Sequence, residues 1–268
     1  MRIALVQLSY GDDEPFDDRV ERVARTVAGL ADHDLVVLPE LWAPTGFGYQ
    51  GWADEAQPLD GPWARSMAEV ARSAGVVLHA GSFVEELDDP GPDGHDLANT
   101  SLVLDATGAT LGVYRKIHRF GFGAGEPKLM EAGTEVVVID LPDGSGGTVR
   151  TGLSTCYDLR FPELYRRQQE AGAEMFLVPA AWPAARVGHW SLLGRARAVE
   201  NQAVVVQVNT GGTHAGTSMG GHSQVVTATG DVLAEAAHAG EAVLSVLVDT
   251  SDTARYRRDF PVLPDRRL

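Results

Sequence analysis

The 268-residue chain is predicted to be an α/β protein, and three observations predict this class. Amphipathic helical stripes alternate with apolar strand-like runs in both halves of the chain. Some of these runs are apolar throughout, which is typical of strands covered on both faces. Between the two alternating halves lie short strand pairs joined by turns. The fold is therefore expected to combine βα crossovers with antiparallel pairs.

The first half supplies three strands and two helices. The amino-terminal apolar run is too short for a signal segment, so we interpret it as a strand and expect no targeting segment. Two stretches with apolar residues three and four positions apart predict the helices. A hairpin follows around a turn at residues 106–109. In chain order, the segments are strand 2–8, helix 16–30, strand 34–41, helix 63–74, strand 76–83 and the hairpin 100–114.

The second half repeats the alternation and ends in a tail without strand or helical period. Residues 115–133 are interpreted as a loop. We expect one domain over residues 1–268, with residues 251–268 as a C-terminal tail, because no change in composition marks a linker. The remaining predicted segments are strands 134–141 and 149–155, a helix opened by Pro162, strand 174–181, helix 189–202, and strands 203–209, 222–227, 232–236 and 242–248.

Composition excludes several classes of partner. The net charge is −15 and the isoelectric point is about 4.8, which argues against nucleic acid or an anionic membrane surface as the main partner. No run approaches the ~18 apolar residues that a membrane span needs. A single cysteine rules out an intramolecular disulfide and favours a reducing compartment, so a cytoplasmic location is expected.

That single cysteine, Cys156, lies between a predicted strand and a helix that Pro162 can open. A thiol at such a turn points out of the sheet end and lies near a helix N-terminus. The helix dipole and nearby cations lower the pKa of a thiol placed there, so a reactive nucleophile is one interpretation. The other is a small buried apolar side chain.

A cysteine nucleophile needs a base and a group that stabilises an oxyanion. Glu40 ends an apolar strand, where partial desolvation suits a general base, although a carboxylate in water is the alternative. Lys116 follows the hairpin and has the charge to stabilise an oxyanion, unless it is simply solvated beside Arg115. Glu126 lies in a Gly-rich loop, and on its own it is expected to be exposed.

Other chemistries have weaker support. The histidines show no metal-ligand spacing, so no metal site is expected. The glycines near residue 123 do not form a dinucleotide-binding pattern. A Cys–His pair with His118 or His189 stays open, since spacing along the chain cannot establish contact.

Three motifs together resemble the nitrilase superfamily of carbon–nitrogen hydrolases. They are Leu38-Pro-Glu-Leu41, Tyr114-Arg-Lys-Ile-His118 and Thr155-Cys-Tyr-Asp-Leu-Arg-Phe-Pro-Glu163, in that family's order and at typical spacings. Later segments extend the resemblance over essentially the whole chain. They include His189-Trp190, residues 195–202, Gly221-His-Ser223, Gly230-Asp-Val-Leu233 and the tail from Phe260 to Arg266.

The resemblance implies a four-layer αββα sandwich and a Glu–Lys–Cys triad made of Glu40, Lys116 and Cys156. It also implies a second glutamate, for which Glu126 fits better than Glu131. No cofactor is implied. The resemblance further implies a homodimer or larger homo-oligomer, in which outer helices pair and the C-terminal tail reaches the dimer interface.

Within the superfamily, Cys156-Tyr-Asp-Leu-Arg160 is similar to the omega-amidase branch. The implied reaction cleaves a small linear amide to an acid and ammonia through a Cys156 thioester. An N-carbamoyl amino acid hydrolase, a nitrilase or a non-catalytic binding protein on the same fold are the alternatives. The Tyr157 backbone N–H is expected to hold the oxyanion and Arg160 a substrate carboxylate, unless Arg160 pairs with a nearby acid. Tyr49 and Trp182 are expected to line the pocket, with core packing as their alternative.

Overall fold

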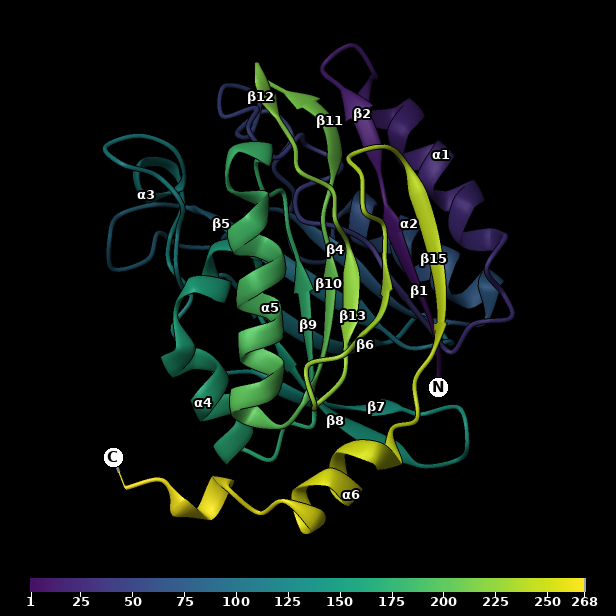
Figure 1. Ribbon diagram of the computed structural model, residues 1–268. Coiled ribbons are helices and arrows are strands. Elements are labelled where there is room, and N and C mark those ends of the chain that lie inside the picture. Colours follow the sequence, from purple (N-terminus) through teal and green to yellow (C-terminus); the bar gives the residue numbers. More distant parts are fainter. Residues whose placement is uncertain (268) are drawn as a thin grey trace.

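The structure is a computed structural model that describes residues 1–267, so Leu268 of the predicted tail lies outside the described residues. Two six-stranded sheets are stacked face to face (Figure 1). In spatial order, the first sheet consists of β15 (Ala242–Leu247), β1 (Arg2–Gln7), β3 (Leu35–Val37), β4 (Val77–Glu86), β5 (Leu97–Leu104) and β6 (Thr110–Arg115).

The second sheet has the same number of strands, and a small third sheet lies at one end of the sandwich. In spatial order, the second sheet consists of β14 (Val232–Glu235), β13 (Gln224–Val226), β10 (Val204–Val208), β9 (Met175–Pro179), β8 (Thr148–Leu153) and β7 (Val138–Pro142). The third sheet consists of β12 (Thr217–Ser218), β11 (Gly211–His214) and β2 (Ser9–Gly11), none of which was predicted.

Helices cover the outer faces of both large sheets, which confirms the predicted αββα sandwich (Figure 1). On the first sheet lie α1 (Phe16–Ala28) and α2 (Pro62–Ala74), and on the second lie α4 (Pro162–Glu170) and α5 (Val187–Asn201). Strand β1 shows why the chain builds two cores. Ile3 and Leu5 belong to the apolar cluster that contains the second sheet, whereas Ala4 and Val6 belong to the cluster under α1 and α2. Both faces of the strand are thus buried.

The strand directions bring distant parts of the chain to one edge of the sandwich. Strand β3 is parallel to β1 and β4, and β9 is parallel to β8 and β10. The loops after β3 and β9 meet at that edge, where the backbone N–H of Ala181 donates a 2.8 Å hydrogen bond to Glu40. Lys116 directly follows β6 and reaches the same place.

Two stretches predicted to be irregular contain helices. The tail forms α6 (Ser251–Asp259) and a short 3-10 turn, Leu263–Asp265, and the loop before Gly133 contains α3 (Glu126–Leu129). An apolar stripe cannot reveal α6, because only Thr253 of its residues is buried. Instead Arg257 anchors the helix by donating to the backbone oxygens of Ala173 and Asn201.

Candidate active site

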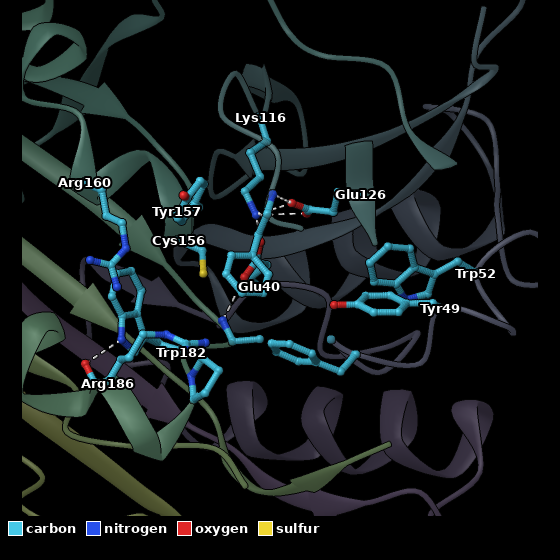
Figure 2. Close-up of a pocket in the computed structure, with 15 residues that line it drawn as sticks. Glu40, Tyr49, Trp52, Lys116, Glu126, Cys156, Tyr157, Arg160, Trp182 and Arg186 are labelled. Atoms are coloured by element: carbon cyan, nitrogen blue, oxygen red, sulfur yellow. Dashed lines mark hydrogen bonds and ion pairs between the residues drawn. The ribbon is translucent and has the colours of Figure 1, made fainter. Parts of the chain in front are cut away.

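A pocket of about 400 Å³, counting its open mouth, lies at the edge where these loops meet (Figure 2). It brings together all eight residues that the sequence singled out for catalysis or substrate binding. Seven more residues complete the lining. The full set is Glu40, Gly46, Phe47, Tyr49, Trp52, Lys116, Phe120, Glu126, Cys156, Tyr157, Arg160, Ala181, Trp182, Pro183 and Arg186.

The inner half of the pocket, defined here as Glu40, Lys116, Glu126 and Cys156, is almost fully buried. The ammonium of Lys116 lies 2.7 Å from Glu40 Oε1 and 2.9 Å from both oxygens of Glu126. The exposed fraction is 2% for Lys116 and 3% for Glu40, so the solvated alternatives for these two residues are excluded. Glu126, expected to be exposed on local grounds, is buried because α3 turns it inward and the Phe120 backbone N–H donates to it.

Asn99 connects the two carboxylates, and sequence reasoning missed it. Its amide Nδ2 donates to Glu40 Oε1 at 2.9 Å and to Glu126 Oε1 at 2.7 Å. Asn99 belongs to β5, which is otherwise mostly apolar and buried. A buried amide in such a strand must find hydrogen-bond partners, and that was the available signal.

Cys156 begins a 3-10 turn, Cys156–Arg160, that separates β8 from α4. Its backbone adopts φ of 48°, an uncommon conformation for a residue with a side chain. Burial and the negative charge of Glu40 raise the pKa of the thiol well above its usual value, although Lys116 opposes them. The expectation of a lowered thiol pKa is therefore wrong, because the thiol is buried and because two carboxylates accompany the one cation.

The charges of the inner half depend on one another. Burial disfavours the ammonium of Lys116, but Glu126 and Glu40 outweigh burial and raise its pKa well above the usual value. Burial, assisted by the charge of Glu40, raises the pKa of Glu126, while Lys116 opposes the shift. Lys116 thus stays charged, and the cluster places a cation and a proton acceptor beside the thiol.

The outer half of the pocket, defined here as Phe120, Arg160, Trp182 and Arg186, carries two guanidinium groups. Arg160 lies 4.7 Å from the ring centre of Trp182, and Arg186 lies 5.6 Å from that of Phe120. Within residues 1–267, neither guanidinium is within ion-pair distance of a carboxylate. The ion pair that was the alternative for Arg160 does not form.

Aromatic side chains close the remaining wall, and both Tyr49 and Trp182 line it. Trp182 is also 2% exposed and part of the apolar cluster that contains the second sheet, so core packing holds for it as well. Tyr49 packs edge-on against Trp52 with ring centres 4.8 Å apart, and also contacts Phe47. Burial, with the nearby charge of Glu126, raises the pKa of Tyr49 to about 12, so its hydroxyl stays protonated. Trp182 donates its indole N–H to the backbone oxygen of Arg186 (Figure 2).

Other candidates lie outside the pocket. Glu131 accepts hydrogen bonds from the backbone of Asp93 and His95. His118 is 2.7 Å from Asp158, and His189 lies beside Arg160, so neither forms a Cys–His pair. Among residues 1–267 there is no group of His, Cys, Asp and Glu that could hold a metal ion, and no helix long and apolar enough to cross a membrane.

The comparison with known families agrees with this geometry. Residues 2–258 match the model of the carbon–nitrogen hydrolase family, and the chain belongs to that family. A 2-oxoglutaramate amidase of Paenarthrobacter nicotinovorans is 45% identical over 265 residues, which cover 99% of this chain and 89% of that protein.

More distant relatives point to the same group. The human omega-amidase is 31% identical over 277 residues, covering 99% of this chain and 95% of that protein. A solved structure from Xanthomonas campestris, a carbon–nitrogen hydrolase superfamily protein with an arsenic adduct in its active site, superposes with a TM-score of 0.88 at 28% identity. It covers 100% of this chain and 97% of that one. The resemblance to the nitrilase superfamily and its omega-amidase-like branch is thereby confirmed.

Proposed function

We propose that the protein is a cysteine-dependent amidase that cleaves the terminal amide of a small linear acid, with 2-oxoglutaramate and succinamate as representative substrates. One observation carries the proposal: Lys116 holds two buried carboxylates at 2.7–2.9 Å in the pocket that also contains the only thiol of the chain. Relatives named 2-oxoglutaramate amidase and omega-amidase support the substrate class.

Glu40 is the proposed general base of the first step. Its Oε1 is held by Lys116 and its Oε2 by the backbone N–H of Ala181, and its negative charge acts on the Cys156 thiol. As the sulfur attacks the amide carbon, Glu40 takes the thiol proton. Because the pKa of the resting thiol is raised, proton removal has to accompany attack.

Lys116 and the backbone N–H of Tyr157 are the proposed donors to the oxyanion. One such donor contributes roughly 3–4 kcal/mol to the stability of the transition state. Glu40 then gives its proton to the leaving nitrogen, the C–N bond breaks, and ammonia departs. The acyl group stays on Cys156 as a thioester.

Water completes the cycle. Glu40, again a carboxylate, takes a proton from water as the oxygen attacks the thioester carbon. The C–S bond breaks, the acid leaves, and the proton returns to the sulfur. Glu126 accepts hydrogen bonds from Lys116 with both of its oxygens and keeps the ammonium in place during both steps.

The two guanidinium groups of the outer half support a substrate with a carboxylate at its far end. Both are half-buried at the pocket and have no carboxylate partner among residues 1–267, so they are free to bind an anionic group. A guanidinium binds a carboxylate well through paired hydrogen bonds. Arg160 and Arg186 are the proposed carboxylate ligands, with Trp182 supporting Arg160 by stacking.

The test measures ammonia release from a panel of 2-oxoglutaramate, succinamate, a neutral amide, an N-carbamoyl amino acid and a nitrile. We expect the two carboxylate-bearing amides to be hydrolysed fastest, with no release by Cys156→Ala. Faster release from the carbamoyl compound or the nitrile would shift the assignment to those branches. Equal rates for wild type and Cys156→Ala, or no turnover of any compound, would remove the proposal.

We also propose a homodimer or larger homo-oligomer in the cytoplasm. Large apolar side chains on the surface support self-association, notably Leu192 and Val199 on α5 and Phe260 after α6, which are 49–65% exposed. Residues 251–268 are proposed to lie at that interface. A catalytic thiol must stay reduced, which a cytoplasmic location would ensure. Sedimentation analysis of the purified protein tests the assembly.

A further inference from the structure

We propose that the buried carboxylate of Asp158 is the positioning residue that locks the nucleophile's turn to the strand carrying Lys116. This inference rests on the proposed amidase function for its kinetic readout. Asp158 is fully buried two residues after Cys156, and it touches neither the pocket nor the other catalytic groups. Its role has to be exerted through the residues that it binds.

Each oxygen of Asp158 accepts two hydrogen bonds. Oδ2 accepts from the hydroxyl of Tyr114 at 2.6 Å and from the backbone N–H of Thr155 at 2.9 Å. Oδ1 lies 2.9 Å from the backbone nitrogen and 2.7 Å from Nδ1 of His118. Because a carboxylate oxygen only accepts, Nδ1 of His118 carries the hydrogen.

These partners come from the two segments that catalysis must hold together. Tyr114 and His118 lie two residues before and two residues after Lys116, and both are bound to Asp158. Thr155 directly precedes Cys156. The carboxylate of Asp158 therefore fixes the segment that carries Lys116 relative to the turn that carries Cys156.

The backbone of Cys156 needs such support. A non-glycine residue at φ of 48° is strained and persists only where neighbouring contacts determine it. The bond from the Thr155 N–H to Asp158 closes the turn on one side, and the Asp158 N–H returns a 3.0 Å bond to the Thr155 oxygen. Phe161, stacked on His118 at 3.8 Å between ring centres, closes the other side.

Tyr114→Phe is the sharpest variant, because it deletes one hydroxyl and leaves Asp158 with three donors. The matched control is Tyr165→Phe, since Tyr165 is equally buried and donates or accepts a 2.8 Å bond with Ser154, near the same turn. We expect Tyr114→Phe to lower kcat by about tenfold with KM unchanged, as for a contact that matters only in the chemical step. The control is expected to keep kcat within about twofold of wild type.

Asp158→Asn extends the test, with a second readout that needs no substrate. We expect the rate of Cys156 alkylation by iodoacetamide to fall in Asp158→Asn and Tyr114→Phe, but not in Tyr165→Phe. The double variant Tyr114→Phe with Asp158→Asn should be no slower than Asp158→Asn alone, since both remove the same contact. If Asp158→Asn does not fold, the comparison of Tyr114→Phe with Tyr165→Phe still tests the inference.

Two results would overturn the inference. One is an equal loss of kcat in Tyr114→Phe and Tyr165→Phe, which would make the bond merely structural. The other is unchanged alkylation of Cys156 in Tyr114→Phe. Alkylation also separates this inference from the proposed function: a protein that hydrolyses no amide can still show the alkylation difference, and only its absence counts against Asp158.

Discussion

The inner and outer halves of the pocket hold their charges in opposite ways. In the inner half, the ammonium of Lys116 is enclosed by Glu40 and Glu126 and is 2% exposed. In the outer half, the guanidinium groups of Arg160 and Arg186 rest on aromatic rings and are only partly buried. The inner charges are satisfied by the protein itself, whereas the outer ones remain available to a ligand. Under the proposed function, chemistry and substrate selection are thereby separated in space.

The largest effect is expected from breaking the inner half at its centre. Lys116→Met leaves two buried carboxylates without their cation, which typically costs about 3–5 kcal/mol of stability. Turnover should be lost at the same time. The control is Lys128→Met, which changes the only other lysine of the chain, an exposed residue on α3.

Ammonia release and urea unfolding measure both properties. Lys128→Met is expected to match wild type in each. If Lys116→Met were as stable and as active as Lys128→Met, the ion pairs of the inner half would contribute no more than exposed ion pairs do. That result would contradict the role assigned to Lys116.

Glu40→Gln is expected to lower kcat by about 10³-fold, because the base is lost while the shape is kept. The same change should lower the pKa of Cys156. The charge of Glu40 raises the pKa of the thiol, so a neutral amide in its place lets the thiolate form at lower pH. Ultraviolet absorbance of the thiolate during a pH titration measures this shift. A titration curve identical to that of wild type would contradict the assigned contact.

Asn99→Ala tests whether the amide between the two carboxylates of the inner half contributes to activity. The variant removes the amide that joins Glu40 to Glu126, and each lost hydrogen bond to a charged group costs about 1.5–3 kcal/mol. We expect a loss of about tenfold or more in kcat, with the thermal midpoint lowered. Kinetics and calorimetry on the same sample test it, and an unchanged kcat would remove Asn99 from the site.

The smallest effect is expected in the outer half. Arg186→Gln should raise KM for succinamate by about tenfold, with kcat nearly unchanged, since binding of a distant carboxylate is equal in ground and transition states. A neutral amide of the same length should show no change. The exposed Arg195 provides the control variant, Arg195→Gln. An equal rise in KM for both substrates would contradict carboxylate binding.

The two halves also differ in how far the sequence could predict them. Motifs around Glu40, Lys116 and Cys156 carry the resemblance to a family, so the αββα sandwich and the inner half could be predicted. Asn99 belongs to no motif, and the one signal for it was a lone amide in a mostly apolar strand, which does not say which groups the amide binds. Helix α6 was not predicted, because no apolar stripe marks it. Arg257 anchors the helix through hydrogen bonds to backbone oxygens instead.

Electrostatics were the hardest to predict. Position near a helix N-terminus suggested a lowered thiol pKa, but the direction depends first on how deeply the fold buries Cys156 and then on which charges it brings there. The sequence places Glu40, Lys116 and Glu126 far apart along the chain, and only the loops after β3 and β6 together with α3 bring them into contact. The raised pKa of Cys156 follows from that three-dimensional arrangement.

The most direct test of this account is the mass of the protein during turnover. Because the chain has one cysteine, rapid acid quenching with succinamate followed by intact-mass and peptide analysis locates the acyl group without ambiguity. We expect one acyl group, on the peptide containing Cys156, appearing with the first ammonia released and absent from Cys156→Ala. Ammonia release at the wild-type rate by Cys156→Ala, with no adduct in either protein, would contradict it.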